Sequence, residues 1–150
     1  MLAFSMGISG HILTSVAAIG IAFSVTRSIS LSLGVAIGSL LLDADHFLDY
    51  LFIDNQRSLN PIRFLKYYSK YFPPRRVLLL HSYELLIVLL SFAFLTSSKA
   101  LGGFAVGAFI HLVADILPRS NRSIRSRIKL YSFIYRWHHG FNSSRLYRQD

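Results

Sequence analysis

The sequence predicts an all-α integral membrane protein: a four-helix bundle, made of two helical hairpins, with interfacial amphipathic helices. Three observations predict this fold class. The 150 residues are 53% hydrophobic and only 15% charged, whereas soluble domains carry about 25% charged residues. The apolar residues are gathered into four charge-poor blocks, each near the roughly 20 residues that cross a bilayer core. The 16 Lys and Arg residues lie between and after these blocks, as in the loops of membrane proteins.

The four blocks span about residues 8–25, 29–53, 77–96 and 100–117. Arg27 separates the first two blocks and residues 97–99 separate the last two, so each pair is expected to form a hairpin. We expect residues 1–118 to form the transmembrane domain, with an amphipathic cytoplasmic loop at about 54–76. Residues 119–150 are expected to form a basic amphipathic cytoplasmic tail. A soluble helical bundle with unusually buried helices is the alternative fold.

The distribution of Lys and Arg predicts the orientation. The two outer turns carry one basic residue each, Arg27 and Lys99, whereas the segment between the second and third blocks carries six and the tail after Leu117 carries eight. Loops rich in Lys and Arg stay on the cytoplasmic side. Both termini and the central loop are therefore expected in the cytoplasm, and the protein in a bacterial-type inner membrane.

Two segments outside the blocks have the composition of interfacial helices. Residues 60–72 begin with Asn60 as a potential N-cap and Pro61 at the first helical position. Their expected apolar side consists of Ile62, Leu65, Tyr68 and Phe72. Residues 122–137 mix basic and large apolar residues in a similar way. We expect both segments to lie on the anionic inner leaflet, with membrane lipids as partners. Nucleic acid is the competing, less favoured partner for the tail.

Ionisable residues interrupt all four blocks near the predicted cytoplasmic end. Four of the six histidines and five of the seven carboxylates are expected at this depth. They are His11 in the first block, Asp43, Asp45, His46 and Asp49 in the second, His81 and Glu84 in the third, and His111 and Asp115 in the fourth. Each such group costs at least about 2.5–3.5 kcal/mol inside a membrane. We therefore expect these side chains to face one shared polar site.

The donor types predict a metal site. Imidazole and carboxylate ligands, in a chain without cysteine, suit zinc, iron or manganese, with magnesium as an alternative where carboxylates dominate. His111 and Asp115 are four residues apart, as are Asp45 and Asp49, so each pair shares a helix face. Nine candidates exceed the three or four ligands of one catalytic zinc. Either two ions bind, or some groups orient ligands and accept protons. A proton or cation pathway is the alternative.

Four motifs, in order, resemble the predicted membrane-bound metal-dependent hydrolases, also described as LexA-binding, inner-membrane-associated hydrolases. They are "GHIL" at 10–13, "LLDADH" at 41–46, "LHSYEL" at 80–85 and "GAFIHLVADIL" at 107–117. Leu42 stands where that family usually has proline, and the stretch "RRVLLLHS" lacks the usual His-Arg. The resemblance implies that the metal-site residues are His11, Asp43, Asp45, His46, His81, His111 and Asp115.

This resemblance, with a more distant one to zinc-dependent phospholipase C-like proteins, implies hydrolysis of a phosphoester. One or two divalent ions, with zinc expected first, would activate water. Glu84 or Asp49 is expected to act catalytically by accepting the proton of that water. The depth of the site favours a lipid-like substrate, and a soluble cytoplasmic one remains open. A metal-ion or proton transporter is the main alternative. The third hypothesis is a non-catalytic membrane scaffold in which the metal only holds the helices together.

Overall fold

The computed structural model of the chain describes residues 8–71, 73–117 and 124–146, so Phe72 lies outside the described residues. The regular elements are helices α1 (Ile8–Thr26), α2 (Ile29–Leu41), α3 (Ala44–Leu48), the π-helix η1 (Asp49–Ile53), α4 (Pro61–Lys70), α5 (Tyr83–Thr96), α6 (Lys99–Ile116), α7 (Ile124–Leu130), α8 (Phe133–His138) and α9 (Ser143–Leu146). One isolated β-bridge joins Arg75 and Asn142. The all-α prediction is confirmed for the described residues.

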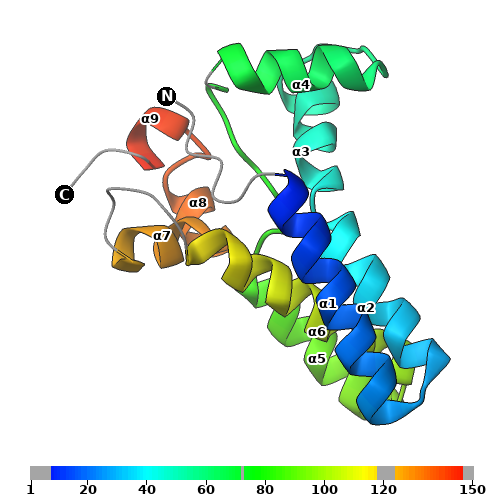
Figure 1. The fold of residues 1–150 in the computed structure, drawn as a ribbon. Coiled ribbons are helices and arrows are strands. Elements are labelled where there is room, and N and C mark those ends of the chain that lie inside the picture. Colours follow the sequence, from blue (N-terminus) through cyan, green and yellow to red (C-terminus); the bar gives the residue numbers. More distant parts are fainter. Residues whose placement is uncertain (1–7, 72, 118–123, 147–150) are drawn as a thin grey trace.

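Helices α1, α2, α5 and α6 lie side by side and form the bundle (Figure 1). α1–α2 and α5–α6 are the two hairpins, and their turns lie where the sequence predicted them. Arg27 and Ser97 follow α1 and α5 in the left-handed backbone region, with φ of 52° and 50°. The helices that start after these turns are capped by Ser28 and Ser98, whose hydroxyls accept the N–H of the third helical residue.

Glycine brings α2 and α6 into direct backbone contact at the centre of the bundle. A Cβ atom on Gly34 or Gly38 would lie 2.2 or 2.1 Å from a carbonyl oxygen of α6. A Cβ atom on Gly103 or Gly107 would lie 2.1 or 2.3 Å from a carbonyl oxygen of α2. In both helices the glycines are four residues apart, which is the small-residue pattern that lets membrane helices approach closely. No larger residue fits at these four positions without moving a helix.

The prediction of four membrane spans is not confirmed. Among the described residues, α6 has the length and hydropathy to cross a membrane, and α2 passes the same test only when joined to α3 and η1 across a 41° bend. Residues 10–26 of α1 and the whole of α5 are apolar but shorter. α5 begins at Tyr83 rather than near residue 77, because the residues before it bind the carboxylates described below. The structure establishes an all-α fold with one or two candidate spans.

The surface and the interior of the bundle have an unusual division of residue types. Large apolar side chains are exposed, among them Leu13 (71%), Leu95 (78%) and Phe94 (85%). The main cluster of buried apolar residues in the bundle consists of Leu42, Leu86, Ala105, Ala108 and Leu112. Histidines, aspartates and serines are buried beside it. Soluble proteins favour the reverse arrangement, and contiguous exposed apolar surface indicates contact with another phase or partner.

Aromatic contacts attach α4 to the end of the bent second block. Phe64 lies 5.3 Å from Phe47 and 5.5 Å from Tyr50, and Tyr67 lies 5.2 Å from Tyr50, between ring centroids. The aromatic side of α4 therefore packs on the protein. Of the side expected to face the lipid surface, Ile62 and Leu65 are exposed, whereas Tyr68 is buried. Tyr68 is buried because its hydroxyl and ring contact His46 in α3.

Candidate metal centre

The candidate site lies at the end of the bundle where α2 passes into α3, and five of the predicted ligands meet there. His11 is near the start of α1, Asp43 is in the turn between α2 and α3, and His81 precedes α5. His111 and Asp115 occupy the last turns of α6. His81, His111 and Asp115 are almost fully buried, whereas the side chain of Asp43 is 52% exposed. The site therefore has a buried interior and one exposed carboxylate.

Asp115 is at the centre of the donor atoms. Its Oδ1 lies 3.1 Å from His11 Nε2, and its Oδ2 lies 3.8 Å from His81 Nε2 and 3.6 Å from His111 Nε2. His111 Nε2 also lies 3.5 Å from Asp43 Oδ1. Two overlapping groups, His11–His111–Asp115 and Asp43–His81–His111, each offer three donor atoms within 4.8 Å of one another. Both groups could hold a metal ion.

The spacing of these donors fits a metal site. Ligands bound about 2.0–2.2 Å from a tetrahedral zinc ion are separated from one another by roughly 3.3–3.6 Å. The distances of 3.1–3.8 Å between the donors bracket that range. The Nε2 atoms of His81 and His111 are buried, and they face carboxylate oxygens of Asp43 and Asp115 at 3.5–3.8 Å, longer than an ordinary hydrogen bond. A buried polar atom without a close partner is costly, and a metal ion between these groups would satisfy both nitrogens.

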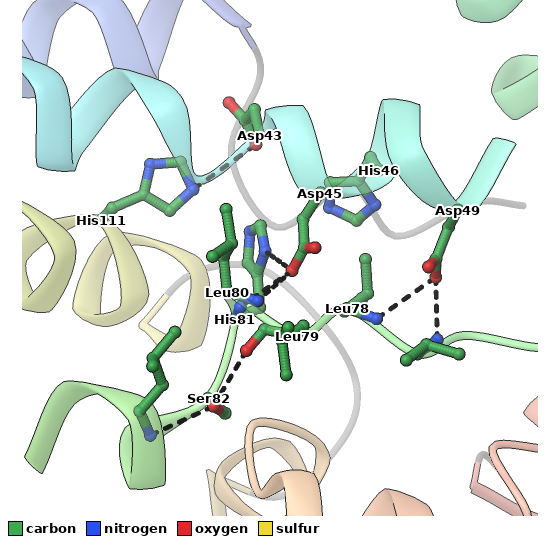
Figure 2. A network of polar contacts seen from close by, with 12 residues as sticks. Asp43, Asp45, His46, Asp49, Leu78, Leu79, Leu80, His81, Ser82 and His111 are labelled. Carbon is green, nitrogen blue, oxygen red and sulfur yellow. Dashed lines mark hydrogen bonds and ion pairs between the residues drawn. The ribbon is translucent and has the colours of Figure 1, made fainter. Parts of the chain in front are cut away.

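The other ring nitrogen of each of these two histidines contacts an acceptor. His111 Nδ1 lies 2.7 Å from the carbonyl oxygen of Ser39, on α2. Because a carbonyl can only accept, Nδ1 must carry the hydrogen, which leaves the Nε2 lone pair for the site. His81 Nδ1 likewise lies 3.4 Å from an acceptor, Asp45 Oδ2 (Figure 2). Such outer contacts fix the tautomer and orientation of metal-binding histidines.

Asp45 and Asp49 hold the segment that carries His81. Asp45 Oδ2 accepts the backbone N–H of Leu80 and of His81, and Asp49 Oδ2 accepts those of Val77 and Leu78 at 2.8 and 3.3 Å (Figure 2). Asp45, a predicted ligand, thus lies behind the His81 ring and outside both donor groups. Asp49, a predicted proton acceptor, is 5% exposed and is occupied by peptide groups.

His46, another predicted ligand, lies beside the cluster. Its ring centroid is 4.9 Å from that of His81 and 5.7 Å from that of Tyr68, and it belongs to neither donor group. The Tyr68 hydroxyl donates to the His46 carbonyl oxygen at 3.0 Å. Among the described residues, His46 therefore packs between Tyr68 of α4 and His81 of the site.

Glu84, the other predicted catalytic residue, binds the start of α8. Its carboxylate accepts the Ser132 hydroxyl and the backbone N–H groups of Phe133 and Ile134, the latter two at 2.9 and 3.2 Å. Glu84 belongs to neither donor group. These contacts favour a structural role, while the general-base role stays a prediction.

Sequence reasoning missed Arg136, which belongs to the basic tail expected on the lipid surface. Its side chain is instead buried, with 2% exposure, and it donates to the carbonyl oxygens of Val77, Leu78 and His81. Seven other Lys and Arg residues follow Leu117, and no feature of the sequence separates Arg136 from them. The tail in fact packs against the segment before α5, which is a tertiary arrangement that composition does not encode.

The comparisons with known proteins add no relative. No family model matches the chain, and neither the search of curated proteins nor that of solved structures gives a match. The resemblance carried by the four motifs therefore has no independent support. What the described residues establish is a set of buried His/Asp clusters that could bind metal, within an all-α fold.

Proposed function

We propose that the chain is a membrane-bound metal-dependent hydrolase that cleaves a phosphoester, with a lipid headgroup or lipid-linked phosphate as the substrate class. The observation that carries the proposal is the convergence of donor atoms from four separate segments. The set consists of His11, Asp43, His81, His111 and Asp115. Three imidazoles and two carboxylates favour zinc, with manganese, iron or magnesium as alternatives.

The membrane placement is part of this proposal. Four crossings are made by α1, the bent α2–α3–η1 unit, α5 and α6. α5 has 14 residues, about 21 Å at 1.5 Å per residue, so it crosses a hydrocarbon core of about 30 Å only with local thinning. Exposed Leu13, Phe94 and Leu95, together with the glycine contacts between α2 and α6, support a bundle surrounded by lipid.

The density of Lys and Arg supports a site on the cytoplasmic side, with both termini there. α4 exposes Ile62 and Leu65 next to basic residues of the same helix, and α8 exposes Ile134 and Trp137. Such mixed surfaces bind anionic leaflets. These helices would hold the site at the headgroup level, where a lipid phosphoester is found.

The residues have distinct tasks in the proposed reaction. A bound divalent ion would supply Lewis acidity and lower the pKa of a water molecule toward about 7. His81 and His111 present Nε2 because Asp45 and the Ser39 carbonyl occupy the side of Nδ1. The half-exposed Asp43 marks the side from which substrate and water arrive. The attacking water must give up a proton, and we assign Asp43 Oδ2 as its acceptor. The carboxylates of Asp49 and Glu84 are less suited to this role because they already accept backbone N–H groups.

A transporter would need polar groups that continue across the bundle. On α2, the buried hydroxyls of Ser32 and Ser39 donate to the carbonyl oxygens of Ser28 and Ala36. The glycine contacts close the space between α2 and α6 along the same stretch. These observations favour a site at one end of the bundle and thus the hydrolase.

Metal analysis and turnover test the proposal. Protein purified in detergent should hold one or two transition-metal ions, and chelation should lower the melting temperature and stop hydrolysis of phospholipids or of a model phosphodiester. His111→Ala should remove most of the metal and the activity, because it belongs to both donor groups. His138→Ala is the matched control, since this exposed residue lies in the tail. Metal-free protein with no thermal shift on adding metal would refute the proposal, and flux in liposomes without hydrolysis would favour the transporter.

A further inference from the structure

The segment from Val77 to Ser82 is not helical, although it carries His81. Leu78 adopts a positive φ of 45°, which is uncommon for a branched apolar residue. Four backbone N–H groups of the segment donate to Asp49 and Asp45. Two carboxylates therefore bind one side of the segment. Because the segment is not helical, the position of His81 depends on such contacts with distant residues.

Arg136 of α8 fixes the opposite side of the same segment. Its Nε donates to Val77 O at 3.1 Å, its Nη2 to Leu78 O at 2.7 Å and its Nη1 to His81 O at 2.9 Å. Nη1 also donates to Leu130 O, at the end of α7. A single guanidinium thus joins the His81 segment to the C-terminal helices. The planar group with five donors is suited to this task, and a lysine ammonium is not.

The electrostatic setting supports a charged Arg136 at this position. Burial lowers the pKa of the Arg136 guanidinium, whereas the carboxylates of Asp45, Glu84 and Asp49 act in the opposite direction. Arginine stays protonated in proteins. The peptide groups of the segment therefore lie between a cation that binds their carbonyls and carboxylates that bind their N–H groups, so both ends of the peptide dipoles are satisfied.

Further contacts attach the C-terminal helices to both ends of this segment. Before it, Arg76 N donates to Phe141 O and Ser143 N donates to Pro74 O, each at 2.9 Å. After it, Tyr83 N donates to Tyr131 O at 3.1 Å, and Glu84 accepts from the start of α8. Residues 131–143 thus contact the chain on either side of His81.

We infer that Arg136 is a positioning residue of the metal centre: through three backbone carbonyls it holds His81 so that Nε2 faces the other ligands, and residues 131–143 are a structural part of that centre. The inference rests on the proposed metal site. It adds a structural role to a tail that the sequence predicted only as a lipid-binding segment. Its consequence is that metal binding and docking of the C-terminal helices stabilise each other.

Metal titration of variants tests the inference. Arg136→Met should weaken zinc or cobalt binding on the order of 10-fold or more, because losing an outer partner typically costs about 10–100-fold. Arg136→Lys should recover part of the loss, since one ammonium reaches fewer carbonyls than a guanidinium. Arg145→Met removes the same charge from an exposed position of α9 and should bind metal like the wild type. The Co²⁺ absorption spectrum should change in Arg136→Met, because the geometry at His81 is altered.

Hydrogen exchange of the wild-type protein gives a test that needs no variant. Since coupling is reciprocal, adding zinc should slow exchange of the Phe133, Ile134 and Ser143 amides by about 5-fold or more, while the Phe64 amide in α4 should be unaffected. Unchanged exchange at all three amides, or an Arg136→Met variant with wild-type affinity and spectrum, would overturn the inference. A wild type that binds no metal would instead refute the proposed function.

Discussion

The middle of the bundle and its polar end are held together by opposite means, although the same two helices form both. In the middle, α2 and α6 meet through glycine, and carbonyl oxygens occupy the space where a Cβ would be. At the polar end they meet through His111, whose Nδ1 contacts Ser39 O. One face of α6 carries Gly103, Gly107, His111 and Asp115, which are spaced four residues apart.

The packing of this face of α6 against α2 also determines where His111 and Asp115 point. Residues four apart lie on one face of a helix, so the face that brings α6 onto α2 also points His111 and Asp115 into the site. The close approach at glycine is what allows the His111 ring to reach the backbone of α2. The middle of the bundle depends on close backbone packing, whereas the polar end depends on charge and hydrogen bonds and, in the proposed function, on a bound ion. The two regions should therefore respond differently to substitution and to metal.

The largest effect is expected in the glycine contact. Gly103→Ala places a methyl group 2.1 Å from the Leu31 carbonyl oxygen, so the helices must separate. We expect a loss of about 3 kcal/mol or more in the free energy of unfolding, at or above the usual range for overpacking. Reversible unfolding in detergent micelles measures it.

The neighbouring Gly102 is the control, because a Cβ there meets nothing within 4 Å. Gly102→Ala should be neutral or stabilise by about 0.5–1 kcal/mol, the usual gain in a helix. Equal effects of the two substitutions would mean that the helices are not in backbone contact.

An intermediate effect is expected behind the His81 ring. Asp45→Asn should lower metal affinity about 10–100-fold, as for other outer partners of a ligand histidine. Asp49→Asn should cost less, because Asp49 contacts Val77 and Leu78 but not the His81 ring. Isothermal titration with zinc compares the two variants. If Asp45→Asn abolished binding as completely as His111→Ala, Asp45 would be a ligand, as the sequence predicted.

The smallest effect is expected at Glu84. Glu84→Gln keeps an acceptor for the start of α8, so stability should fall by about 1 kcal/mol, in the range of helix caps. Metal content should stay near that of the wild type, and hydrolysis should change only a few-fold. A fall of about 10²–10⁴-fold in turnover with metal retained would identify Glu84 as the general base. Thermal unfolding and single-turnover hydrolysis on the same preparation separate these outcomes.

The order of residues along the chain was enough to predict which side chains reach the polar end of the bundle. The apolar blocks predicted where each helix runs along the bundle, so the pattern of residues placed His11, His111 and Asp115 at one end. The i,i+4 spacing set the common face of His111 and Asp115 for the same reason. These inferences hold because helix geometry is local: a rise of about 1.5 Å and a turn of 3.6 residues do not depend on distant contacts.

What each polar group binds depends instead on tertiary packing. Asp45, His46 and Glu84 were predicted at the same end of the bundle as the donor atoms, yet they contact backbone groups or rings. Their directions depend on the break after α2 and on the non-helical segment before α5, where no helical period applies. Arg136 enters this region from 55 residues beyond His81. A side chain's partner is set by packing between segments far apart in the chain, because the lowest free energy satisfies all buried donors and acceptors together.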